Sequence, residues 1–136
     1  MIPAGFLWAW AGTAAFILAI DAVWLGIVAK GFYSRQLGEL MRDNPNLSIA
    51  ALFYVMYSAA VVILASAPAM RSGSLSDALF LGAILGFAAY GTYDITNLST
   101  LRNWPVTMSL VDIVWGTALT TAAAGAGYWL LGWTQG

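Results

Sequence analysis

Cysteine and histidine are both absent from the sequence, and charged side chains are scarce. Without thiolate or imidazole groups the chain cannot form a disulfide, a zinc site, a His-ligated haem or di-iron centre, or a Ser-His-Asp relay. Five Lys and Arg residues stand against six Asp and Glu, so there is no basic surface for nucleic acid. We therefore expect no cofactor and no nucleic-acid partner, and we identify no catalytic signature.

Hydrophobic residues make up 61% of the 136 positions, and charged residues only 8%. An average soluble domain carries roughly 25% charged residues, so this composition indicates an integral membrane protein. The chain is short and has no Ser/Gly/Pro-rich linker. We predict a single transmembrane domain over residues 1–136.

Four apolar runs are long enough to cross a bilayer, which requires about 20 residues of helix. They cover residues 6–28, 49–69, 79–97 and 106–130. The first run has no basic segment before it and is too long for the core of a signal peptide, so we expect it to be retained as a span. Short connections between successive spans predict an all-α fold, an antiparallel four-transmembrane-helix bundle.

The connection between the first two spans differs in character from the spans. Over residues 31–48 charged residues alternate with apolar ones, and the apolar ones recur at spacings of three and four. This spacing predicts a short amphipathic helix on the membrane surface, ended by Asn44-Pro45-Asn46. A solvated loop is the alternative. The apolar residues are Phe32, Tyr33, Leu37, Leu40 and Met41.

Basic residues are unevenly divided between the two sides of the predicted bundle. The connections after the first and third spans hold Lys30, Arg35, Arg42 and Arg102, whereas the other side holds only Arg71. Cytoplasmic connections carry the excess of basic residues in membrane proteins. We therefore predict that these two connections are cytoplasmic and that both termini lie outside.

Three aspartates interrupt the spans at a similar depth. Asp21 lies nine residues before Lys30, Asp94 eight before Arg102, and Asp112 seven after Pro105. At a rise of about 1.5 Å per residue, each is roughly 10 to 14 Å inside the predicted cytoplasmic boundary. Tyr54 and Tyr57 fall at a similar or slightly shallower level. The sequence thus predicts a polar layer to which every span contributes.

An aspartate at a helix centre costs about 2.5 to 3.5 kcal/mol on insertion scales, so these side chains should face one another rather than lipid. Like charges in a poorly solvated layer cannot all persist, and at least one carboxyl is expected to carry a proton at neutral pH. Hydrogen bonding that merely holds helices together is the alternative to a binding site. The predicted site comprises Asp21, Asp94, Asp112, Asn97, Tyr54, Tyr57, Tyr90 and Tyr93, with Trp24 and Trp115 as apolar lining and Arg102 as the one cation able to reach in.

Residues spaced by four place Asp94 on a definite face of the third span. Gly82, Gly86, Tyr90 and Asp94 form one stripe, small at its first end and acidic at its last. We expect a neighbouring helix to pack closely against the two glycines. The same face then carries the carboxyl group into the interior.

Several motifs together resemble a known family. They are Asp21-x-x-Trp24-Leu25-Gly26, Phe53-Tyr54, Pro68-Ala69, Tyr90-x-Thr92-Tyr93-Asp94-x-Thr96-Asn97-Leu98-x-Thr100-Leu101, Trp104-Pro105 and Asp112-x-x-Trp115-Gly116. The chain resembles, over nearly its whole length, the bacterial membrane family known as domain of unknown function 2177. The resemblance implies a small four-span protein of the bacterial inner membrane, with the termini then periplasmic, and it implies no assigned activity.

Three functions remain open at this point. The leading hypothesis is an acidic, tyrosine-lined site that binds or transports a proton, a cation or a small amphiphile, with membrane lipids as partners. A lipid-modifying intramembrane enzyme is the second, with the aspartates as general acid and base or as oxygen ligands of a hard cation. A structural subunit of a larger membrane complex is the third. A bundle of this size is small for a transport path, which makes a homo-oligomer a reasonable expectation.

Overall fold

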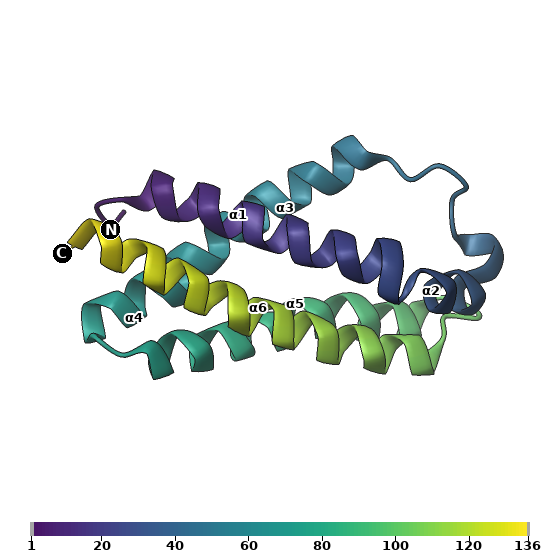
Figure 1. Cartoon of the computed structure of the whole chain (residues 1–136). Helices are drawn as coiled ribbons and strands as arrows, with labels where there is room; N and C mark the ends of the chain where they lie inside the picture. Colours follow the sequence, from purple (N-terminus) through teal and green to yellow (C-terminus); the bar gives the residue numbers. More distant parts are fainter. Residues whose placement is uncertain (1, 136) are drawn as a thin grey trace.

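The computed structural model describes residues 2–135 and contains four helical segments of membrane-spanning length, each antiparallel to the next (Figure 1). The first, Phe6–Val28, joins α1 (Phe6–Val23) to the π-helical turn η1 (Trp24–Val28). The second, Leu47–Ser72, joins α3 (Leu47–Val61), the π-helical turn η3 (Val62–Ser66) and α4 (Ala67–Ser72). The third and fourth are α5 (Leu75–Thr100) and α6 (Val106–Gln135). The predicted all-α membrane bundle is confirmed; the first span matches its apolar run, and the other three are a few residues longer than theirs.

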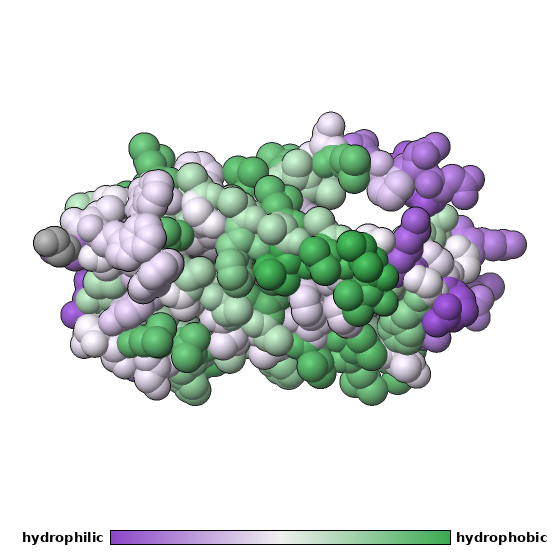
Figure 2. Space-filling view, in the orientation of Figure 1, coloured by the Kyte–Doolittle hydropathy of each residue, from purple (hydrophilic) through white to green (hydrophobic). Residues whose placement is uncertain are grey.

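The two ends of the bundle differ in what they contain. At one end lie the start of α1, the end of α6 and the turn between α4 and α5; at the other lie α2 (Lys30–Leu37) and the connection from α5 to α6 (Figure 1). On the face shown in Figure 2, strongly hydrophilic residues gather at the α2 end, and the middle of the molecule is largely apolar. This division matches the arrangement of spans and connections derived from the sequence.

Helices α5 and α6 make the closest pair, because glycine removes the side chains between them. A Cβ atom added to Gly82 would lie 2.9 Å from the backbone oxygen of Thr120, and one added to Gly86 would lie 2.7 Å from that of Gly116. On α6, a Cβ at Gly116 would overlap the ring of Tyr90. Backbones in membrane bundles approach this closely only where the residues are small. The predicted glycine stripe therefore does face a neighbouring helix, and that helix is α6.

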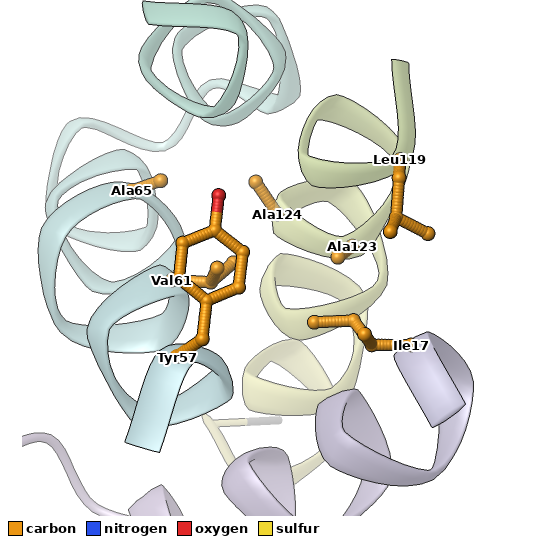
Figure 3. Packing of buried hydrophobic residues seen from close by; sticks show 7 residues of the cluster. All are labelled: Ile17, Tyr57, Val61, Ala65, Leu119, Ala123 and Ala124. Atoms are coloured by element: carbon orange, nitrogen blue, oxygen red, sulfur yellow. The ribbon is translucent and has the colours of Figure 1, made fainter. Parts of the chain in front are cut away.

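The middle of the bundle is filled by apolar side chains from α1, α3, η3 and α6. Figure 3 shows seven of them gathered between these segments, with the ring of Tyr57 among smaller residues. Val61, Ala65 and Ile17 in this cluster are completely buried. Nearer the termini a second group, which includes Ala9, Val62 and Leu131, continues the packing. The half of the bundle toward the termini is thus a closed core.

The segment between the first two spans is shorter in its helical part than the sequence predicts. Helix α2 ends before Gly38, whose positive φ of 55° is a conformation that favours glycine, and a single 3₁₀ turn, η2 (Gly38–Leu40), follows. The predicted stop at Asn44-Pro45-Asn46 is therefore wrong, because the helix has already ended. Asn46 instead begins the next helix: its side chain accepts a hydrogen bond from the backbone N–H of Ile49 at 3.1 Å.

Candidate functional site

A cavity of about 490 Å³ lies in the half of the bundle nearer α2. It is bounded by α1, η1, α2, α3, α5 and α6, so every membrane-spanning segment contributes to its wall. Most of its lining is apolar, and the polar groups are two carboxylates and several phenols. The lining residues are Asp21, Leu25, Tyr33, Leu37, Met41, Phe53, Tyr54, Ala89, Tyr90, Tyr93, Met108, Asp112 and Trp115.

Asp21 is held in the wall by two donors from other helices. Its side chain is buried, one carboxylate oxygen accepts a hydrogen bond from the hydroxyl of Tyr54, and the other accepts one from Nε1 of Trp115 at 2.9 Å. Trp24 stacks on Trp115 with ring centroids 4.3 Å apart and an angle of 8° between the planes. A buried carboxylate with charge-assisted hydrogen bonds to both oxygens is well stabilised. This arrangement ties α1 to α3 and α6.

Asp112 is approached from α2. The hydroxyl of Tyr33 donates to its Oδ1 at 2.9 Å, and Nε1 of Trp24 donates to the Tyr33 oxygen at 3.3 Å. Burial raises the pKa of the Tyr33 phenol above its ordinary value; the hydrogen bond from Trp24 opposes this increase, and the negative charge of Asp112 adds to it. The phenol is therefore neutral and remains a donor. The short helix after the first span thus closes one side of the site.

Asp94 occupies a different position from the other two aspartates. Its side chain is 0% exposed, and neither carboxyl oxygen has a donor within the described chain. Along the contact between α5 and α6, Gly86 lies against Thr120 and Tyr90 lies against Gly116. One helical turn further, the same antiparallel register places Asp94 opposite Asp112. Asp94 does not line the cavity, whereas Asp112 does. The structure therefore places Asp94 opposite Asp112, and it places the third predicted aspartate, Asp21, in the cavity wall with partners of its own.

A second, larger cavity of about 1010 Å³ adjoins the first and shares five lining residues with it. It lies beneath the segment that connects α2 to α3, and Figure 2 shows an opening there beside the hydrophilic end of the molecule. Lys30 and Arg42 are part of its lining, together with Asp43. The shared residues are Asp21, Leu25, Tyr33, Met41 and Tyr54.

Other predicted site residues lie at the edge of the cavity or outside it. Tyr57 is buried below the cavity, where its hydroxyl and that of Thr120 share a hydrogen bond of 2.7 Å. Tyr93 is 54% exposed and packs edge-to-face against Trp104 with ring centroids 5.6 Å apart. Tyr90 lines the cavity and packs edge-to-face against Tyr57.

Asn97 and Arg102 do not contribute to either cavity wall. Asn97 is partly exposed on the last turns of α5, and Arg102 is exposed in the connection to α6. The expectation that Arg102 reaches into the site is therefore corrected. A long side chain beyond the helix end is better solvated in the headgroup region than inside the bundle.

Tyr33 is the polar residue of the cavity wall that the sequence did not identify. From its residue type and spacing we predicted that Tyr33 lies on the apolar face of a helix at the membrane surface. In the structure this face packs onto the bundle, and Tyr33 is buried beside Ala29 and Met108. Its position nine residues after Trp24 was the available signal, since a phenol close to the end of an aspartate-containing span can fold back onto it.

The comparison with known families identifies the chain. It belongs to the family described as predicted membrane protein, domain of unknown function 2177, whose family model matches residues 6–129. The resemblance drawn from the motifs is therefore confirmed. No curated protein and no solved structure matches the chain.

Proposed function

We propose that this member of the family binds a small amphiphile, with the apolar part in the 490 Å³ cavity and the polar end against the carboxylates of its wall. The observation that carries the proposal is the cavity itself, which combines a mostly apolar lining with Asp21, Asp112 and the phenols of Tyr33 and Tyr54. Ligand pockets of about 300 to 1,000 Å³ with few, well-placed polar groups are typical of small-molecule sites.

The hydrogen bonds in the wall favour a ligand that donates. Both oxygens of Asp21 are already occupied by donors, whereas Asp112 uses one oxygen for Tyr33 and faces the cavity from α6. A hydroxyl or ammonium group would be attracted by this charge, and a carboxylate would be repelled. We infer that the ligand is a long-chain alcohol or amine, or a lipid that carries such a group.

The larger cavity supplies an entrance from the side. It connects the site to the region beneath the α2 to α3 connection, where Lys30 and Arg42 lie at the level expected for lipid headgroups. The four basic residues at this end, against Arg71 at the other, favour the cytoplasmic leaflet of a bacterial inner membrane. On this reading the ligand enters from that leaflet.

A pair of adjacent alanines on α5 provides the test. Ala89 lines the cavity and Ala88 is exposed on the outside of the same turn. Ala89→Phe places a phenyl ring in the cavity, while Ala88→Phe places the same ring in detergent or lipid. The probe is dodecylamine, added to the protein in dodecylmaltoside micelles, and bound molecules are counted by native mass spectrometry.

The wild type and Ala88→Phe should each retain one dodecylamine, and Ala89→Phe should lose it. Dodecanoate, which has the same chain and the opposite charge, should bind more weakly than dodecylamine to the wild type and to Ala88→Phe. Equal retention of dodecylamine by Ala88→Phe and Ala89→Phe would contradict the proposal and leave the polar layer a structural role. Conversion of an added lipid into a new species on incubation would instead indicate an enzyme.

A further inference from the structure

Asp94 poses a physical problem that the amphiphile site does not solve. Its side chain is 0% exposed, and both oxygens are buried without a hydrogen-bond donor in the described chain. Transfer of an isolated ionised carboxylate into such surroundings is far more costly than transfer of a neutral polar group, and in practice the group neutralises instead. An ionised Asp94 would have neither water nor a protein donor.

The groups that face Asp94 cannot neutralise it as a cation would. On α6 the register that sets Gly86 against Thr120 and Tyr90 against Gly116 places the Asp112 carboxyl opposite Asp94. From α2 the Tyr33 phenol donates to Asp112. On α1 the Asp21 carboxylate is already held by Tyr54 of α3 and by an indole of α6. The titratable groups around Asp94 are therefore acidic or phenolic.

On α5 itself, Tyr93 is more than half exposed and packs on Trp104. The nearest cation along the chain, Arg102, is exposed in the connection that follows. A proton is the one positive charge that can occupy the space between two adjacent carboxyl groups without any further ligand. Two carboxyls in contact bind one proton between them because both cannot stay ionised at short distance.

We infer that Asp94 and Asp112 share one proton, which Asp94 carries and donates to Asp112. Asp112 then accepts from Asp94 and from Tyr33 and remains the charged member that faces the cavity. Because an ionised carboxylate has about four acceptor positions, Asp112 can still accept from a donor inside the cavity. The pair has one negative charge in total. This inference concerns the protein without ligand and does not rest on the proposed amphiphile binding.

Infrared spectroscopy tests it directly, because a protonated carboxyl has a carbonyl band well separated from those of carboxylates. The chain has only six Asp and Glu side chains, so the band can be assigned by substitution. The wild type at pH 7 should show one such band that resists hydrogen–deuterium exchange. Asp94→Asn should remove it and still fold, because the amide can donate to Asp112 in place of the acid.

Two further variants complete the experiment. Asp77→Asn is the matched control, since Asp77 is an exposed aspartate in the first turn of the same helix, and it should leave the band unchanged. Asp112→Asn should shift the band, because the proton is then donated to an amide oxygen instead of a carboxylate. Absence of the band from the wild type, or its persistence in Asp94→Asn, would overturn the inference. If Asp94→Asn fails to fold, an unshifted band in Asp112→Asn would overturn it equally.

Discussion

Replacing Gly86 by alanine should destabilise the bundle, whereas the same replacement at Gly91 should not. Both glycines are buried on α5, so the two variants are closely matched. A Cβ at position 86 would lie 2.7 Å from the backbone oxygen of Gly116, which cannot move without the whole of α6. A Cβ at position 91 would meet only the Cδ1 atom of Ile95, at an ordinary 3.9 Å.

The difference between the two variants isolates the cost of that overlap. Gly→Ala in a helix interior gains about 1 kcal/mol from helix propensity, and this gain is common to both positions. Overpacking in a well-packed interior costs about 1 to 3 kcal/mol. Gly91→Ala should therefore be up to about 1 kcal/mol more stable than the wild type, and Gly86→Ala should fall about 1 to 3 kcal/mol below Gly91→Ala.

Reversible unfolding in mixed detergent micelles, followed by circular dichroism, measures both free energies. Because the contact between α5 and α6 also sets the separation of Asp94 and Asp112, Gly86→Ala should in addition alter the carbonyl band of the protonated carboxyl. If Gly86→Ala proved as stable as Gly91→Ala, the close approach of the two helices at this point would be refuted.

Three other outcomes are expected. Tyr54→Phe removes one of the two donors to Asp21 and should lower the unfolding free energy by about 0.6 to 1.7 kcal/mol, as for hydrogen bonds inside membrane proteins. The control Tyr128→Phe should not lower it, because the Tyr128 hydroxyl donates to no group in residues 2–135. Equal effects of the two substitutions would contradict the hydrogen bonding of Asp21. The pKa of Tyr33 is raised in the folded state, so its contribution to stability is complete below the ordinary phenol pKa of about 10 and is lost as the pH rises above that value. The unfolding free energy of Tyr33→Phe should therefore fall less steeply with increasing alkaline pH than that of the wild type. Arg102→Ala should change the unfolding free energy by less than about 0.5 kcal/mol, and a larger loss would show that this arginine has a partner inside the bundle.

The sequence predicted the fold well because a bilayer imposes simple requirements. A run of about 20 apolar residues has to be helical to satisfy its own backbone, and short connections force neighbours to be antiparallel. Spacing by four likewise predicted that Gly82 and Gly86 face a helix, although it did not say which one. That information lies in the shape of α6, where Gly116 provides the complementary space.

The details of the site depend on contacts that no local pattern encodes. Depth predicted one level for the three aspartates. Their rotation about the helix axes decides that Asp94 lies opposite Asp112, while Asp21 accepts from Tyr54 and Trp115. Tyr33 was assigned to the membrane surface because a short amphipathic helix is apolar on one face whether it lies on lipid or on its own bundle.

The buried cluster of Ile17, Val61 and their neighbours has a consequence for traffic through the protein. It fills the half of the bundle toward the termini, so a molecule that entered the cavity from one leaflet would have to leave through the same opening. Passage to the opposite leaflet would demand that a helix swing aside. The π-helical turn η3, which lies in this half of the bundle, holds one additional residue and is the point at which the second span would bend.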